Sequence, residues 1–194
     1  MKIQYCSDLH LEFTLNRNYI LQNPIKPVGD VLILGGDITL LNGMSGSFEQ
    51  DFFDRLANEY EQVFWICGNH EFYGGFDSEI MDVSFCEAIR PNVWLTNNHT
   101  QNINEVRLIF STLWSHILPV QEVLIQQFIN DFRLIKYRNQ VLSVEQYNRF
   151  FEQSQAFIAT ELQTPTNCTK TVVVTHHLPS YQCQLPKYKN SPVS

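Results

Sequence analysis

Residues 63–71 read Val63-Phe64-Trp65-Ile66-Cys67-Gly68-Asn69-His70-Glu71, an apolar run that passes directly into a polar cluster. A run that is apolar at every position is typical of a strand buried on both faces of a sheet. A strand-like run before a polar cluster occurs three more times, at 3–7 before Asp8-Leu9-His10, at 31–34 before Gly35-Gly36-Asp37, and at 171–174 before Thr175-His176-His177. We therefore expect four buried strands, each with a polar cluster at its carboxyl end.

The segments between these runs carry helix-like and strand-like patterns. Ser143 with Gln146 fits a capping box, and this pair opens a helix that Pro165 ends. A spacing of four predicts another helix over Phe48, Phe52, Leu56 and Tyr60. Further helices are expected at 77–88 and 118–130, short strands at 93–95, 100–103 and 106–111, and a loop at 8–30. Strands alternating with helices indicate one layered α/β domain, which we expect to span residues 1–194.

The composition narrows the class of protein. Of 194 residues, 44% are hydrophobic and 17% charged, which indicates a globular domain. The net charge of −7 argues against non-specific nucleic-acid binding, but a small phosphorylated substrate remains compatible because bound metals reverse the local potential. No apolar stretch reaches the ~20 residues of a membrane helix, and we find no signal-peptide pattern. Five cysteines without C-x-x-C spacing argue against disulfides, so we expect a cytoplasmic protein with Cys6 and Cys67 in its core.

The first two polar clusters contain carboxylate and imidazole side chains that could bind a metal. Because alternate residues of an extended chain point to the same side, Asp8 and His10 could bind one ion together. Asp37 offers a carboxylate whose two oxygens can bridge two metals. Gly35 and Gly36 before it permit a tight turn and a close backbone approach.

The later clusters add two further ligands, an amide oxygen from Asn69 and an imidazole from His176 or His177. Mixed nitrogen and oxygen ligation without thiolate suits two divalent ions such as Mn, Fe or Zn. Two ions roughly 3.5–4 Å apart would clamp a phosphoester and lower the pKa of a bridging water, which gives a hydroxide nucleophile. His70 is then the natural general acid for the leaving group, oriented by Glu71 or another nearby carboxylate.

Each cluster taken alone also has a structural interpretation. The pair Asp8 and His10 could be accidental, and Gly35-Gly36-Asp37 could be a plain turn. Asn69-His70 could be a hydrogen-bonded loop, and His176-His177 a strand end with one buried histidine. Their joint placement after four predicted strands, with complementary ligand types, favours the metal site.

In this order the clusters resemble the motifs of the calcineurin-like metallophosphoesterases: D-x-H, G-D, G-N-H-[DE] and a histidine after a strand. The resemblance covers the whole chain, and Gly68-Asn69-His70-Glu71 is its most specific part. It implies two mixed β-sheets packed face to face and flanked by helices. It also implies Asp8 and His10 on the first metal, Asp37 as the bridge, Asn69 and His176 on the second metal, and His70 as the proton donor.

One family motif, G-H-x-H, does not occur, and the remaining histidines, His99 and His116, lack its pattern. In the family this motif gives one histidine to each metal, so both ions would be short of a ligand. We expect the sequence to be truncated at the C-terminus, with this motif and the last strands of the second sheet in the remainder. The alternative is a catalytically weak or inactive phosphoesterase-like module for protein interaction.

Several other residues are better explained by structure than by chemistry. We expect Trp114 in the core, His116 at the surface, and Asp131 with Arg133 as an internal ion pair. Tyr73-Gly74-Gly75 fits a rim of the site and a plain loop equally well. Lys187, Tyr188 and Lys189 could contact a phosphate, but they fit a solvated tail better.

Overall fold

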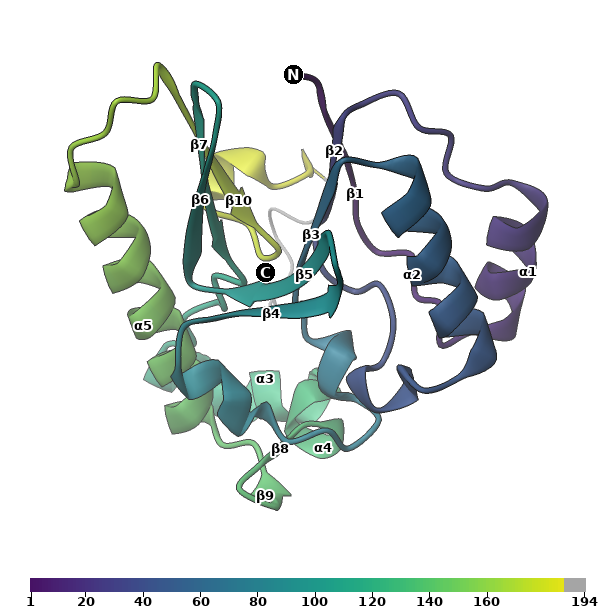
Figure 1. Cartoon of the computed structure of the whole chain (residues 1–194). Helices are drawn as coiled ribbons and strands as arrows, with labels where there is room; N and C mark the ends of the chain where they lie inside the picture. Colours follow the sequence, from purple (N-terminus) through teal and green to yellow (C-terminus); the bar gives the residue numbers. More distant parts are fainter. Residues whose placement is uncertain (187–194) are drawn as a thin grey trace.

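A five-stranded sheet carries three of the four predicted strands with clusters (Figure 1). In the computed structural model, which describes residues 1–186, its spatial order is β1 (Ile3–Cys6), β2 (Val31–Leu34), β3 (Gln62–Ile66), β5 (Val93–Asn97) and β4 (Phe85–Arg90). All neighbours are parallel except β4, which is antiparallel to β5. The carboxyl ends of β1, β2 and β3 therefore lie along one edge of the sheet.

A second sheet of three strands carries the fourth cluster. Its central strand β7 (Val106–Ser111) is parallel to β10 (Lys170–Thr175) and antiparallel to β6 (His99–Ile103). The strand expected at 171–174 is therefore present, but the expectation that it is buried is wrong, because residues 170–173 are exposed. Within residues 1–186, β10 pairs with β7 alone, so its other edge has no strand partner in this part of the chain.

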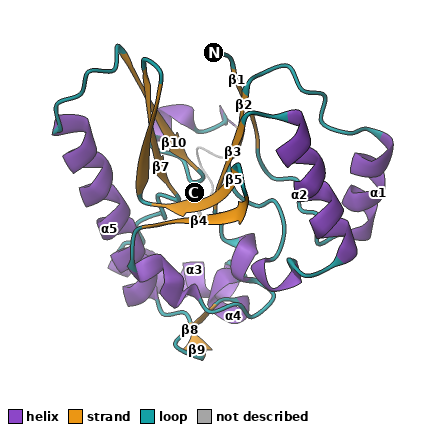
Figure 2. Ribbon diagram, in the orientation of Figure 1, coloured by secondary structure: helices purple, strands orange, loops and turns teal. Residues whose placement is uncertain are grey.

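The two sheets pack face to face through a small apolar core. Phe64 of β3 and Phe110 of β7 stack with ring centroids 4.9 Å apart. Around this pair lie Val31, Ile33, Ile66 and Leu108. Helices α1 (Thr14–Gln22) and α2 (Ser47–Glu59) flank the first sheet, and α5 (Val144–Gln163) flanks the second (Figures 1 and 2). The predicted arrangement of two mixed sheets between helices is confirmed.

Local sequence explains the two longest helices. In the predicted apolar stripe of α2, Phe52, Leu56 and Tyr60 are buried in the core and Phe48 packs against it. Phe53, which the stripe did not include, stacks on Trp65 of β3 at 5.1 Å. In α5, the hydroxyl of Ser143 accepts a hydrogen bond from the backbone N–H of Gln146 at 3.1 Å, which is the predicted N-terminal cap. The helix ends at Gln163, also as predicted.

Two segments differ from the predicted elements. The expected loop at 8–30 contains α1, a helix that buries Ile20 and has no side-chain cap at Phe13, so its sequence signal is weak. The expected helix at 77–88 is a 3-10 turn, η3 (Ser78–Asp82), followed by strand β4. Because β4 pairs with β5 along the sheet edge, cross-strand pairing outweighs the helical spacing of this segment.

The segment between β7 and α5 runs beneath the first sheet in Figure 1. It contains η4 (Pro119–Gln121), α3 (Glu122–Phe128), α4 (Asp131–Leu134) and the hairpin of β8 (Lys136–Tyr137) and β9 (Gln140–Val141). The predicted helix at 118–130 is thus present as η4 and α3. Trp114 is fully buried and His116 exposed, as expected. The remaining short elements are η1 (Leu41–Gly43), η2 (His70–Phe72) and η5 (Tyr181–Cys183).

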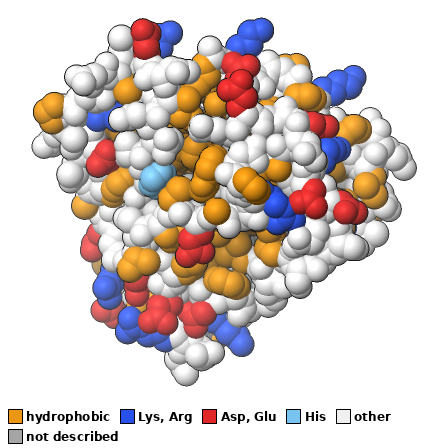
Figure 3. All heavy atoms as spheres, viewed as in Figure 1, with side chains coloured by type: hydrophobic (Ala, Val, Ile, Leu, Met, Phe, Trp, Pro, Cys, Tyr) orange, Lys and Arg blue, Asp and Glu red, His pale blue; other side chains and the backbone are white. Residues whose placement is uncertain are grey.

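Surface and cysteine features agree with a globular domain. All five cysteines are free, with Cys67 buried and Cys6 partly buried. On the face seen in Figure 3, acidic and basic side chains are interspersed, with hydrophobic side chains between them. Within residues 1–186, no helix has the length and apolar character needed to cross a bilayer. Lys187, Tyr188 and Lys189, expected to form a solvated tail, lie outside the described residues.

Candidate metal centre

Backbone hydrogen bonds bring the first two clusters together at the carboxyl ends of β1 and β2. The N–H of Asp8 donates to Gly36 O at 3.0 Å, and the N–H of His10 donates to Asp37 O at 2.9 Å. Asp8, His10 and Asp37 all have left-handed backbone, with φ of 55°, 47° and 55°. The assumption that Asp8 and His10 are extended is therefore wrong. Strained backbone of this kind persists where the surrounding structure fixes it, commonly at functional sites.

The carboxylate of Asp37 is at the centre of the cluster. It is 5% exposed, and its Oδ1 accepts from the His70 N–H at 3.0 Å. Its Oδ2 is 3.7 Å from His10 Nε2, and its Oδ1 is 3.5 Å from His176 Nε2. One carboxylate thus faces two imidazoles, one from each side, which is the position expected of a bridging ligand.

The structure separates the two histidines that the sequence left open. His176 Nδ1 lies 2.9 Å from Gly35 O, so this nitrogen donates its proton and Nε2 is free to face Asp37. His177 instead stacks on Trp114 with ring centroids 5.6 Å apart. Burial and the neighbouring His176 lower the pKa of His177 to about 3. The geometry favours His176 as the residue of the site.

Two glycines make room for this packing. A Cβ on Gly68 would collide with Asp37 Oδ1 and lie 2.7 Å from His176 Nε2. Gly36 has φ of 90°, and a Cβ there would collide with His176 Nδ1. Both positions therefore require glycine, and the space they leave is next to the nitrogen and oxygen donors of the cluster.

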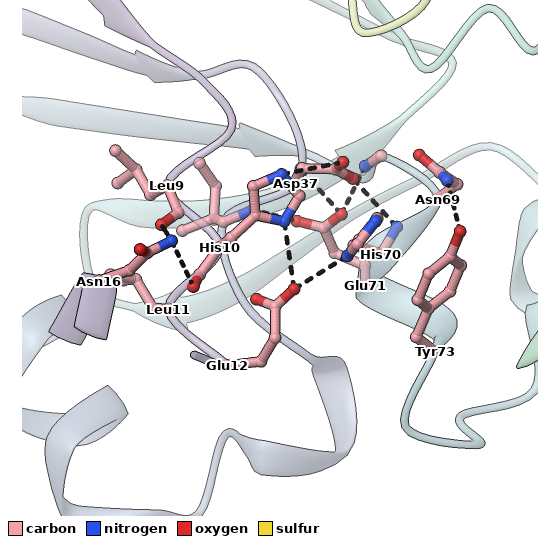
Figure 4. Close-up of polar contacts among 12 residues, drawn as sticks. Leu9, His10, Leu11, Glu12, Asn16, Asp37, Asn69, His70, Glu71 and Tyr73 are labelled. Carbon is pink, nitrogen blue, oxygen red and sulfur yellow. Dashed lines mark hydrogen bonds and ion pairs between the residues drawn. The ribbon is translucent and has the colours of Figure 1, made fainter. Parts of the chain in front are cut away.

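Glu12 is a residue of the site that the sequence interpretation missed (Figure 4). Its Oε1 is 3.1 Å from His10 Nδ1 and 2.9 Å from His70 Nδ1. Burial would lower the pKa of His70, but its hydrogen bond to Glu12 and the charge of Asp37 raise this pKa overall. Since Glu12 follows His10 by two positions, the pattern D-x-H-x-E is the sequence signal that could have identified it.

Asn69 lies at the far side of the cluster, held by two other polar side chains. Its Nδ2 donates to Asp131 Oδ1 at 2.8 Å and to the Tyr73 hydroxyl at 3.1 Å. The predicted ion pair between Asp131 and Arg133 is wrong, because Asp131 is engaged here and Arg133 donates to Gln127 O instead. Tyr73 thus contacts the candidate site, which favours a rim of the site over a plain loop for Tyr73-Gly74-Gly75.

Glu71 does not orient His70. From the sequence, either Glu71 or another nearby carboxylate was expected to have this role, and the choice of Glu71 is wrong. It is completely buried, and its carboxylate accepts four hydrogen bonds, from the backbone N–H groups of Asp37, Ile38 and Gly68 and from Trp65 Nε1. Burial and the charge of Asp37 raise the pKa of Glu71 to about 7, against the effect of the N–H donors. Glu71 therefore joins the ends of β2 and β3.

We expect Glu71→Gln to lower the free energy of unfolding by about 2–6 kcal/mol. The NH2 group of the glutamine would face two of the four N–H donors and leave them without an acceptor. Each unsatisfied buried donor costs ~1–3 kcal/mol. Urea unfolding followed by tryptophan fluorescence measures this change. Glu87→Gln, at an exposed position of β4, is the matched control and should change little. A Glu71→Gln variant as stable as the parent would contradict the assigned role.

The donor set fits a transition metal. His10, Asp37 and His70 each place one donor atom within 4.8 Å of the others, and His176 Nε2 approaches Asp37 from the opposite side. Asp8 is exposed, and its carboxylate makes no hydrogen bond or ion pair with residues 1–186. Of the predicted site residues, His10, Asp37, His70 and His176 come together directly. Asn69 joins them through Tyr73, whose ring stacks on His70 at 4.1 Å.

A two-sheet α/β fold with histidine, carboxylate and amide donors at its strand ends defines the class of the metallophosphoesterases. The model of the calcineurin-like phosphoesterases matches residues 1–192, and the chain belongs to this family.

Two individual proteins extend the comparison. The chain is 27% identical over 203 residues to an uncharacterized protein, L509, of Acanthamoeba polyphaga mimivirus, covering 92% of this chain and 68% of that one. Among solved structures, it resembles a phosphopantetheinyl hydrolase from Mycobacterium tuberculosis with a TM-score of 0.57 and 14% identity, covering 91% of this chain and 68% of that one. At this identity, the second likeness concerns the fold.

Proposed function

We propose that the protein is a dinuclear metal-dependent phosphoester hydrolase that uses His70 as its general acid. The position of Asp37, with one carboxylate oxygen toward His10 Nε2 and the other toward His176 Nε2, carries the proposal. Asp8 and His10 would hold the first metal, and Asn69 and His176 would hold the second metal. Asp37 would be a ligand of both metals. Two bound cations supply Lewis acidity, which lowers the pKa of water and stabilises charge on phosphoryl oxygens.

The side chains around the cluster perform the remaining tasks. Glu12 accepts from Nδ1 of both His10 and His70, which leaves each Nε2 free. When His70 is protonated, its Nδ1–H stays bonded to Glu12 and its Nε2–H can be donated to the leaving oxygen of the ester. Burial opposes the charged imidazolium, but the hydrogen bond to Glu12 and the charge of Asp37 raise the pKa of His70, which favours its protonated form. His10 and His70 thus share one orienting carboxylate but have different roles.

The composition and the donor set also support proposals for the metal, the substrate and the cellular location. Mn, Fe or Zn suits a site of imidazole, carboxylate and amide donors. The substrate would be a small phosphorylated molecule, either a monoester or a diester, since a net charge of −7 does not favour nucleic acid. Five free cysteines are compatible with a reducing cytoplasm.

We expect the purified chain to hydrolyse chromogenic phosphomonoesters or phosphodiesters when Mn²⁺ is added, and to lose this activity when the metal is removed by a chelator. Release of nitrophenolate measures the rate. The 194-residue chain and a version extended through a G-H-x-H motif should be compared. An extended version that binds metal but hydrolyses none of these esters would contradict the proposal.

The absence of G-H-x-H from residues 1–194 favours one alternative, a catalytically weak or inactive interaction module. Its presence beyond Ser194 stays a prediction. Calorimetric titration of the 194-residue chain with Mn²⁺ separates the two functions. Tight binding of two ions would contradict the alternative, and no detectable binding would favour it.

A further inference from the structure

Asp131 is a buried carboxylate that no family motif includes, yet it contacts the candidate metal centre. It begins α4, in the segment between β7 and α5, and is 2% exposed. Its Oδ1 accepts from the Tyr73 hydroxyl at 2.5 Å and from Asn69 Nδ2 at 2.8 Å. Two groups that lie 58 and 62 residues away in the sequence therefore converge on one oxygen.

These contacts determine which way the amide of Asn69 points. A carboxylate oxygen accepts hydrogen bonds, so the NH2 group of Asn69 must face Asp131. The Tyr73 hydroxyl gives its proton to Asp131 and also accepts from Asn69 Nδ2, at 3.1 Å. Rotating the amide by 180° would place its oxygen against the oxygen of Asp131 and would lose both bonds. The amide oxygen is therefore directed away from Asp131.

The ring of Tyr73 extends this arrangement to the proposed acid. It stacks on His70 with ring centroids 4.1 Å apart and an interplanar angle of 28° (Figure 4). The Tyr73 hydroxyl thus holds Asn69 while its ring supports the face of His70. Because Asp131 is nearly excluded from solvent, water does not compete for these bonds, and the orientation persists.

We propose that Asp131, together with Tyr73, is a positioning residue that presents the Asn69 amide oxygen to the second metal, an inference that rests on the proposed function of Asn69. The segment between β7 and α5 then contributes to metal affinity without supplying a ligand. Partners of metal ligands at this distance typically change metal affinity by about 10- to 100-fold when they are removed.

Calorimetric titration of the full chain with Mn²⁺ tests the inference. Asp131→Leu should weaken one of the two binding events by about 10- to 100-fold and leave the other unchanged. Asp131→Asn keeps an acceptor oxygen and should retain most of the affinity. Tyr73→Phe keeps the ring on His70 but loses the hydroxyl, so it should weaken the same binding event.

A second Asp–Tyr–amide cluster provides the matched control. Asp82 accepts from the Tyr137 hydroxyl at 2.7 Å and from Gln146 Nε2 at 3.2 Å, outside the metal centre. Asp82→Leu should lower stability without changing Mn²⁺ affinity. If both leucine variants weaken metal binding equally, the effect of Asp131 is general destabilisation and the inference fails.

Nuclear magnetic resonance of the metal-free protein gives a readout that does not depend on metal. The Asn69 side-chain NH2 protons should exchange slowly with solvent in the parent and in Asp131→Asn, and rapidly in Asp131→Leu. If the parent binds two ions and Asp131→Leu binds them equally well, only this inference is overturned. If the parent binds no metal, the proposed function and the inference fail together.

Discussion

Asp37→Asn should abolish hydrolysis and remove the second metal while leaving the fold intact. The asparagine oxygen can still accept from the His70 N–H, which Asp37 Oδ1 now accepts at 3.0 Å. The charge between His10 and His176 is lost, however, and so is the second anionic oxygen. Metal ions contribute several kcal/mol to such reactions, and each ~1.4 kcal/mol is tenfold, so turnover should fall at least ~10³-fold.

Elemental analysis, calorimetry with Mn²⁺ and the nitrophenolate assay together measure this result. Asp51→Asn, on an exposed position of α2, is the matched control and should behave as the parent does. Thermal unfolding of the metal-free proteins checks that Asp37→Asn remains folded. Two bound ions at parental affinity in Asp37→Asn would refute the bridging role.

His70→Ala should keep both metals and slow turnover about 10²–10⁴-fold, the usual contribution of a positioned general acid. The loss should depend on the leaving group. An alkoxide needs a proton as it departs, so esters of alcohols should show the full effect. Nitrophenolate departs readily without a proton, so its esters should show little.

Glu12→Gln provides a graded comparison with His70→Ala. The amide oxygen of glutamine can still accept from the two imidazole N–H groups that Oε1 now serves, but it has no charge. We expect the same leaving-group pattern with a smaller loss, about 10- to 100-fold. Equal losses on all esters would argue against acid catalysis. Loss of a metal from His70→Ala would make His70 a ligand, since it lies within the donor cluster.

The sequence predicted the parts of the fold that depend on local pattern. Runs such as 31–34 and 63–67 are apolar throughout because their strands are covered on both faces, and both were identified. Strand β4 was not identified from the sequence, because it is a strand through its pairing with β5. The spacing of residues within β4 does not indicate this pairing. Helix α1 was missed because a helix that buries one side chain has little periodicity.

The candidate site divides in the same way. Asp37, His70 and His176 were predicted as site residues because their residue types and their places after strands agree, and the structure brings these residues together. Their roles stay predictions. Asp131 was interpreted as half of an ion pair, because its partner in the sequence is an arginine while its partners in space are Asn69 and Tyr73. Second-layer contacts of this kind depend on the tertiary fold.

The position of β10 at a sheet edge links the metal centre to the dynamics of that edge. Within the described part of the chain β10 has one pairing partner, and edge strands open to solvent at lower free energy than central ones. Opening would move His176 away from Asp37. A metal ion that uses His176 as a ligand therefore binds only while β10 is paired with β7. Its binding stabilises this paired state by mass action. Metal binding would therefore favour the state in which β10 stays paired with β7 and His176 stays beside Asp37.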